Sequence, residues 1–125
     1  MTEQGNALDG RKILVVEDDY LVALALAEML KATGANVIGP LSEIQEALSF
    51  VEAGNDLDAA ILDVDLHGQK SYPVAQALAA RQIRFVFATG YGEEAIDRAY
   101  RAYPRVQKPF DERTLVNVLL PPHPS

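Results

Sequence analysis

The sequence contains no cysteine, and this absence excludes several kinds of chemistry. There can be no disulfide framework, no thiol nucleophile and no cysteine-based metal site. The chain also lacks an apolar stretch of about 18 residues, the length that a transmembrane helix needs. Residues 1–10 are polar and acidic, unlike a signal peptide. We therefore expect a soluble, cytoplasmic protein that does not associate with a membrane.

Positive charge is also scarce. The 125 residues include 11 lysines and arginines against 18 aspartates and glutamates, which gives a net charge of -7. This balance argues against binding of nucleic acid by the domain itself. A hydrophobic content of 49% at this length suits one folded domain with a substantial core. We predict a flexible N-terminal segment over residues 1–10, the domain over 11–120 and a tail over 121–125.

Strand-like and helix-like segments alternate along the chain with short connections. Strands are expected at residues 11–16, 36–38, 59–63, 84–88 and 106–108. Helices are expected at residues 20–33, 42–53, 74–81, 93–100 and 112–120. The alternation predicts a parallel sheet with helices on both faces, because the crossovers are right-handed. The first helix has a small polar face and should be heavily buried. We also expect a capping box from Ser42 and a loop over residues 67–71.

Polar and charged side chains stand where four of these strands end. Glu17 and Asp18 follow the first strand, and Asp63 ends the third. Thr89 follows the fourth strand, and Lys108 lies at the end of the fifth. The carboxyl ends of parallel strands share one edge of the sheet, where ligands bind in folds of this kind. These five side chains should therefore gather at one site.

Three carboxylates at one edge repel each other and raise their pKa values, which a hard divalent cation would relieve. Oxygen-only ligands favour Mg²⁺, which works with phosphate substrates. Lys108 could pair with Asp63 and then with a transferred anionic group, to which Thr89 could donate its hydroxyl. Each feature also has an ordinary interpretation: an acidic helix start, a surface lysine, a threonine that favours strands. Their joint placement at four strand ends favours a Mg²⁺ and phosphate site over these ordinary interpretations.

Four short motifs at these strand ends can be compared with known families. They are Ile13-Leu14-Val15-Val16-Glu17-Asp18-Asp19, Ile61-Leu62-Asp63-Val64-Asp65-Leu66, Ala88-Thr89-Gly90 and Gln107-Lys108-Pro109-Phe110. Together they resemble the receiver domain of bacterial two-component response regulators, and the resemblance covers about residues 11–120. The run Phe87-Ala88-Thr89-Gly90-Tyr91 is also similar to the signature of the single-domain receivers called the FAT GUY subgroup.

This resemblance implies a fold and a function. The fold would be a three-layer α/β structure, a (βα)5 flavodoxin- or CheY-like doubly wound parallel sheet with strand order 2-1-3-4-5. The function would be that of a stand-alone receiver, phosphorylated by a sensor histidine kinase or a histidine phosphotransfer protein. The product would switch a protein-interaction surface, or the chain would act as a phosphate shuttle or sink in a phosphorelay. No turnover of an external substrate is expected. The downstream target and homodimer formation stay open.

The resemblance also implies roles for the matched residues. Asp63 would be the phosphoacceptor. Asp18 would bind Mg²⁺ directly and Glu17 through water. Asp63 and the backbone carbonyl of Asp65 would be further ligands, and Mn²⁺ could substitute for Mg²⁺. The phosphoryl oxygens would be held by Lys108 and Thr89, with a cis peptide bond between Lys108 and Pro109.

Three positions depart from the family pattern. His67 stands where receivers usually have proline, which suggests an ordinary loop residue or, alternatively, a kinase contact. Ser71 stands where the family usually has glycine. Arg105 replaces the aromatic residue that usually relays phosphorylation to the rest of the domain. Tyr91 or Tyr103 could take over that relay, or Arg105 could respond to the new charge itself. We also expect Tyr91 to overhang the phosphoryl group and limit the access of water.

Two other functions fit part of the sequence. The run Asp63-Val64-Asp65 matches the Asp-x-Asp of haloacid-dehalogenase-like phosphatases, which also form an aspartyl phosphate. In that family the motif follows the first strand, whereas here it follows the third. A degenerate receiver that binds a partner without phosphorylation is the second alternative. The intact set of matched catalytic positions argues against it.

Overall fold

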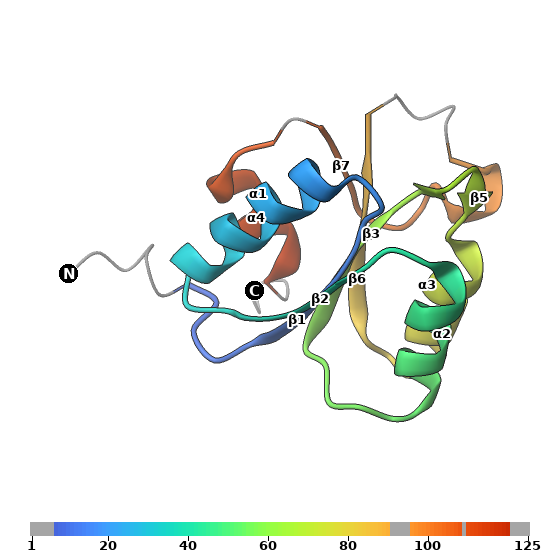
Figure 1. Ribbon diagram of the computed structural model, residues 1–125, viewed down its shortest axis with the longest axis horizontal. Helices are drawn as coiled ribbons and strands as arrows, with labels where there is room; N and C mark the ends of the chain where they lie inside the picture. Colours follow the sequence, from blue (N-terminus) through green and yellow to red (C-terminus); the bar gives the residue numbers. More distant parts are fainter. Residues whose placement is uncertain (1–6, 91–95, 109, 121–125) are drawn as a thin grey trace.

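A computed structural model describes residues 7–90, 96–108 and 110–120 of the chain. Its central sheet has five parallel strands in the order β2-β1-β3-β6-β7 (Figure 1). These are β1 (Lys12–Val16), β2 (Asn36–Leu41), β3 (Ala59–Asp63), β6 (Arg84–Thr89) and β7 (Arg105–Gln107). When these five strands are counted along the chain, the order is 2-1-3-4-5, which confirms the predicted fold.

Two pairs of α-helices cover the two faces of the sheet (Figure 1). They are α1 (Tyr20–Ala32) and α4 (Glu112–Leu119) on one face, and α2 (Ile44–Glu52) and α3 (Tyr72–Ala80) on the other. Helices on both sides of one sheet make three layers, so the predicted three-layer arrangement is present.

No helix in the described ranges is long and apolar enough to cross a membrane.

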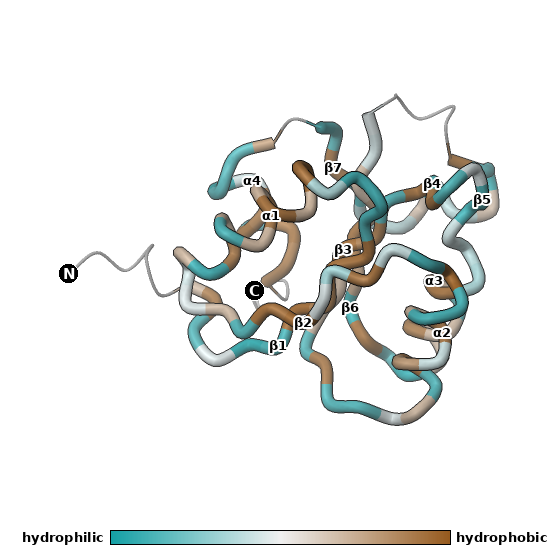
Figure 2. The backbone as a smooth tube through the Cα atoms, in the orientation of Figure 1, coloured by the Kyte–Doolittle hydropathy of each residue, from teal (hydrophilic) through white to brown (hydrophobic). Residues whose placement is uncertain are grey.

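The core lies on both faces of the sheet because side chains alternate along each strand. On β1, Ile13 and Val15 pack with residues of α1 and α4, whereas Leu14 and Val16 pack with residues of α2 and α3. All four are at most 1% exposed. Figure 2 shows apolar strand segments in the centre of the fold and more hydrophilic segments around them.

Packing begins before the first strand, at Leu8. This side chain is fully buried in the core on the α1 and α4 side of the sheet. Its backbone amide donates to the carbonyl of Thr33 at 3.0 Å, and the amide of Gly10 donates to Gly34 at 3.0 Å. Part of the segment expected to precede the domain is thus attached to it.

Replacing Leu8 with alanine should lower the free energy of unfolding by about 2–4 kcal/mol, because it leaves a cavity in a closed part of the core. Urea unfolding followed by circular dichroism measures this loss. Leu21→Ala is the matched control: that leucine is 73% exposed, and its truncation should cost less than about 0.5 kcal/mol. Equal losses in the two variants would contradict the packing of Leu8.

The second strand is longer than predicted and continues through Gly39 and Pro40 to Leu41. The pairing between β1 and β2 shifts between Leu14 and Val16, and Val16 then pairs with Leu41. Gly39 has φ 96°, and a Cβ at this position would lie 2.8 Å from the carbonyl oxygen of Val15. Glycine therefore permits the irregular pairing, which a sequence pattern does not reveal.

Three predictions about helices are wrong in part. The second helix begins at Ile44, its N-cap is Glu43, and no side chain bonds the cap, so the capping box from Ser42 is absent. The expected helix at 93–100 falls partly outside the described residues; residues 96–100 contain only the 3-10 helix η3 (Arg98–Tyr100). The first helix is not heavily buried throughout, because only one side of it packs against the sheet and the opposite side is exposed. Its large exposed apolar residues are Tyr20, Leu21 and Leu24.

The expected loop after the third strand contains a small antiparallel hairpin. Its strands are β4 (Asp65–Leu66) and β5 (Gln69–Lys70), and Asp65 pairs with Lys70. The turn residues His67 and Gly68 have φ values of 51° and 83°. Two successive positive φ angles are typical of the tight two-residue turns that match the twist of paired strands.

Candidate functional site

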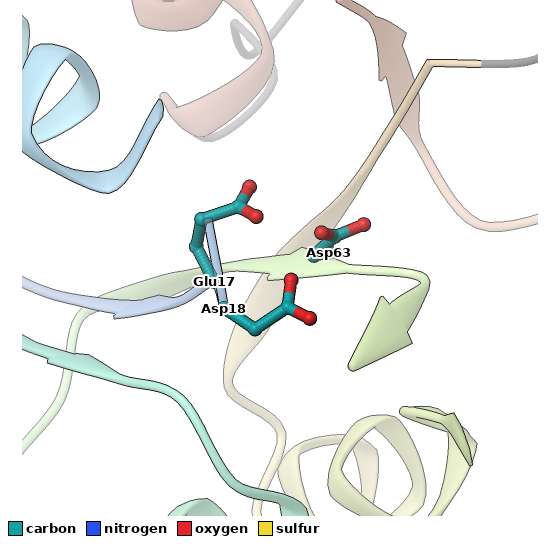
Figure 3. Close-up of side chains that lie close together, drawn as sticks. All are labelled: Glu17, Asp18 and Asp63. Carbon is teal, nitrogen blue, oxygen red and sulfur yellow. The ribbon is translucent and has the colours of Figure 1, made fainter. Parts of the chain in front are cut away.

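Three carboxylates meet at the carboxyl edge of the sheet (Figure 3). Asp63 is the last residue of β3, and Glu17 and Asp18 follow the end of β1. These strands are neighbours in the sheet, and Val16 pairs with Leu62, so the residues that come next lie side by side. One carboxylate oxygen from each residue lies within 4.8 Å of the other two. This grouping of oxygen ligands fits one hard divalent cation.

Lys108, which follows β7, contacts two of these carboxylates. Its Nζ donates to Oε1 of Glu17 at 2.7 Å and to Oδ2 of Asp63 at 3.4 Å. The sequence predicted the pair with Asp63, but the shorter contact is with Glu17, which is only 3% exposed. The other oxygen of Glu17 accepts the amide of Asp19 at 3.1 Å. The buried charge of Glu17 is therefore compensated on both oxygens, as a buried carboxylate requires.

The pKa of Asp63 is raised from its ordinary 3.8 to about 7. Burial is the main cause, and the hydrogen bond and charge of Glu17 add to it, whereas Lys108 lowers the pKa. For Lys108, burial lowers the pKa, but the contacts with Glu17 and Asp63 outweigh it and raise the pKa overall. Lys108 is thus charged at neutral pH beside an acid that is readily protonated. A cation among the carboxylates would favour the ionised form of Asp63.

Thr89 lies where the sequence predicted, at the last position of β6, and it is 4% exposed. Its carbonyl accepts the amide of Lys108 at 2.7 Å, so the two residues are held together by the pairing of β6 with β7. Asp63 pairs with Ala88, the residue before Thr89. All five predicted residues are therefore placed at this edge of the sheet. Tyr91 and the bond between Lys108 and Pro109 fall outside the described residues.

The hairpin after β3 adds contacts that sequence reasoning missed. The amide of His67 donates to Oδ2 of Asp18 at 2.8 Å, and the amide of Asp65 donates to Oδ1 of Asp63 at 3.3 Å. The carboxylate of Asp65 forms an ion pair with Lys70 at 2.9 Å. The use of the Asp65 carbonyl as a ligand stays a prediction. Gly68, a residue type that favours tight turns, was the available sequence signal for this hairpin.

Of the three relay candidates, Tyr103 and Arg105 lie within the described residues, and Tyr91 lies outside them. Tyr103 packs on Phe85, with ring centroids 4.8 Å apart. Phe85 precedes Thr89 by four residues, about 13 Å along an extended strand, so Tyr103 lies away from the site. Arg105 donates from Nη1 to the carbonyl of Arg101 at 2.8 Å.

Sequence reasoning missed another aromatic residue, Tyr100, which packs on residues of α3 and β6. Tyr100 stacks on Tyr72 with ring centroids 4.2 Å apart and contacts Phe87 edge-on at 6.3 Å. Gln76 donates to the Tyr100 hydroxyl at 2.5 Å. Tyr72 begins α3, and its hydroxyl accepts the amide of Asp97 at 2.8 Å. Tyr72 and Tyr100 therefore connect the start of α3 with the segment between β6 and β7.

The fold and the acidic edge together are those of a signalling domain, and comparison with known families agrees. A family model described as the response regulator receiver domain matches residues 13–120. The chain belongs to this family. Membership in the FAT GUY subgroup stays a prediction.

Three relatives illustrate the range of similarity. SdrG from Sphingomonas melonis Fr1 is 42% identical, with a TM-score of 0.79 over 95% of this chain and 96% of that one. The transcriptional regulatory protein PdtaR from Mycobacterium tuberculosis is 30% identical over 92% of this chain and 58% of its own length. The receiver domain of the sensor histidine kinase PA1611 from Pseudomonas aeruginosa PAO1 was solved with a magnesium ion in its active-site cleft. It shares the fold at 21% identity, with a TM-score of 0.73 over 88% of this chain and 94% of that one.

A second solution structure, of the BeF3-activated conformation of SdrG from Pseudomonas melonis Fr1, is 44% identical. Its TM-score is 0.73 over 87% of this chain and 96% of that chain. This chain spans less than two thirds of the length of PdtaR. The family and the fold are therefore shown over nearly the whole chain, whereas the activity of a whole regulator is not carried over with them.

Proposed function

We propose that this chain accepts a phosphoryl group on Asp63 in a Mg²⁺-dependent reaction and passes the signal to a protein partner. The observation that carries the proposal is the grouping of the Asp63, Glu17 and Asp18 carboxylates within 4.8 Å, with the Lys108 ammonium 3.4 Å from Asp63. Phosphoryl transfer depends mainly on positioning and on neutralising charge. This site supplies a carboxylate acceptor, a fixed cation and ligands for a second cation.

In the proposed reaction, an oxygen of the Asp63 carboxylate attacks the phosphorus of a phosphohistidine. The new O–P bond forms as the N–P bond breaks, and the released imidazole takes up a proton. Lys108 and the hydroxyl of Thr89 hold the phosphoryl oxygens, whose negative charge grows during transfer. Both residues are positioned by the pairing of β6 with β7.

The metal would be held by the side chains of Asp18 and Asp63, by Glu17 through water, and by the backbone carbonyl of Asp65. It would draw charge from the transferred group and from the acceptor carboxylate. Mn²⁺ accepts the same oxygen ligands and should substitute for Mg²⁺. The fit rests on the all-oxygen donor set and its spacing.

The proposed donor is a sensor histidine kinase or a histidine phosphotransfer protein. A protein donor is supported by the exposed apolar side chains of Tyr20, Leu21 and Leu24, because α1 begins directly after the acidic residues 17–19. Exposed apolar residues grouped on one helix are typical of a protein contact. We propose that residues 11–120 form a receiver that passes its signal to a downstream protein.

For the relay of the signal, we propose the segment between β6 and β7. Arg105 and Tyr103 stay candidates, and Tyr100 joins them through its stacking on Tyr72. Phosphorylation of Asp63 adds negative charge beside Thr89 and would bias the arrangement of the residues that follow it. Tyr91, two residues after Thr89, stays the candidate for limiting water access.

Incubation with acetyl phosphate and Mg²⁺, followed by intact-mass measurement, tests the proposal. We expect one phosphoryl adduct on the wild type, none with EDTA, and none on Asp63→Ala. An adduct that survives in Asp63→Ala, or no adduct on the wild type, would overturn it. A generic phosphate ester should not be turned over, which separates this function from that of a haloacid-dehalogenase-like phosphatase.

A further inference from the structure

The turn between β4 and β5 places His67 against the acidic site. His67 has φ 51°, in the left-handed region that few residue types adopt without cost. Its backbone amide donates to Oδ2 of Asp18 at 2.8 Å. This bond joins residues 49 positions apart in the sequence, so it fixes the hairpin to the end of β1.

The imidazole ring of His67 is less well placed than the amide. Its Nδ1 lies 3.7 Å from Oδ2 of Asp18, and its Nε2 lies 3.9 Å from Oε2 of Glu43. Both distances exceed hydrogen-bonding range, and the side chain is 56% exposed. Distance and exposure thus favour the amide, rather than the ring, as the group that acts on Asp18.

We propose that the main-chain amide of His67 positions the Asp18 carboxylate for metal binding, so that His67 is a positioning residue of the site. The inference rests on the proposed function, in which Asp18 is a metal ligand. A carboxylate has two oxygens with several lone pairs. One hydrogen bond from a backbone amide therefore orients the group and leaves it free to bind a cation. Hydrogen bonds of this kind to ligating carboxylates commonly set metal affinity.

The backbone of the hairpin sets the position of this amide. The ion pair between Lys70 and Asp65 at 2.9 Å joins its two strands. The amide of Ser71 closes the segment by donating to the carbonyl of Val64 at 2.8 Å. The same hairpin presents the amide of Asp65 to Asp63 at 3.3 Å. It therefore directs one backbone donor at each of two carboxylates of the site.

Proline and glycine at position 67 separate the two possible contributions. Proline has no amide hydrogen and its φ is fixed near −65°, so it can provide neither the donor nor the turn. Glycine keeps the amide and adopts positive φ freely, but it removes the imidazole. The comparison of His67→Pro with His67→Gly therefore separates the contribution of the backbone at position 67, its amide and its positive φ, from that of the imidazole.

Calorimetric titration of the full chain with MgCl₂ measures the effect without any phosphorylation. We expect His67→Gly to bind Mg²⁺ within about twofold of the wild type, and His67→Pro to bind about 10–100-fold more weakly. Equal affinity of His67→Pro and the wild type would overturn the proposal. An equal loss in both variants would also overturn it, because the ring would then be the acting group. Absence of Mg²⁺ binding by the wild type would instead remove the proposed function itself.

Hydrogen exchange gives a second measurement that does not depend on the folding of His67→Pro. In the wild type, the amide of His67 should be protected by its bond to Asp18. In Asp18→Ala the exchange of this amide should speed up by about tenfold or more, while amides in the core of β3 keep their rates. Unchanged exchange at His67 would show that the bond does not form, and the proposal would be wrong.

Discussion

Replacing Lys108 with methionine should slow phosphorylation by acetyl phosphate about 10²–10³-fold, as loss of a fixed donor for developing negative charge typically does. Methionine keeps most of the length of the side chain and removes its charge. The lost contacts are those to Glu17 at 2.7 Å and Asp63 at 3.4 Å. The pKa of Asp63 should also rise, because Lys108 lowers it. The rate is measured by intact mass at saturating Mg²⁺ across a range of pH.

Lys70→Met is the matched control for this prediction. Lys70 is a second lysine close to the acidic residues, but it pairs with Asp65 and is 45% exposed. Its removal should change the rate by less than about threefold, since an exposed ion pair has a small energetic effect. Lys108→Arg should recover part of the rate by keeping the charge. If Lys108→Met and Lys70→Met react equally fast, the assigned role of Lys108 is wrong.

Replacing Asp63 with asparagine should stabilise the protein at pH 8 in the absence of Mg²⁺, by about 1–3 kcal/mol. The folded pKa of Asp63 is about 7, whereas its ordinary value is 3.8. Between these pH values the folded state binds more protons than the unfolded state, so stability falls as pH rises and the penalty is complete above pH 7. Asparagine removes the charge and with it the penalty.

Urea unfolding at pH 4 and at pH 8 checks this expectation. The advantage of Asp63→Asn over the wild type should shrink toward pH 4, where the wild-type carboxyl is protonated in the folded state. Added Mg²⁺ should stabilise the wild type more than Asp63→Asn, because a ligand that binds only the folded state adds to stability. A variant less stable than the wild type at pH 8 would contradict the raised pKa of Asp63.

The strands that carry the site, and the residues at their carboxyl ends, could be predicted because they depend on short local patterns. Apolar runs that end in Glu17, Asp63 and Thr89 define where strands stop, and the alternation of strands with helices makes the sheet parallel. Parallel strands then bring their carboxyl ends to one edge, whatever the details of packing. The N-terminal cap of α4 depends on residues only three positions apart, because Asp111 accepts the amide of Thr114 at 2.8 Å.

The features that were missed depend on contacts between distant residues. The length of β2 depends on how closely Gly39 approaches Val15, and the exposure of Leu21 depends on which stripe of α1 faces the sheet. The expected helix after Thr89 has too little local signal to show that only η3 forms within residues 96–100. Periodicity does not record the neighbours that decide such cases.

The sequence by itself determined the fold, the family and the set of chemical groups at the sheet edge, because each follows from residue types at strand ends. Only the tertiary structure decided how those groups are paired. Lys108 lies closer to Glu17 than to Asp63. The amide of His67 reaches Asp18 across 49 residues. Both contacts arise from strands and turns that meet only in the folded chain, where distance and burial select among partners that the sequence leaves equivalent.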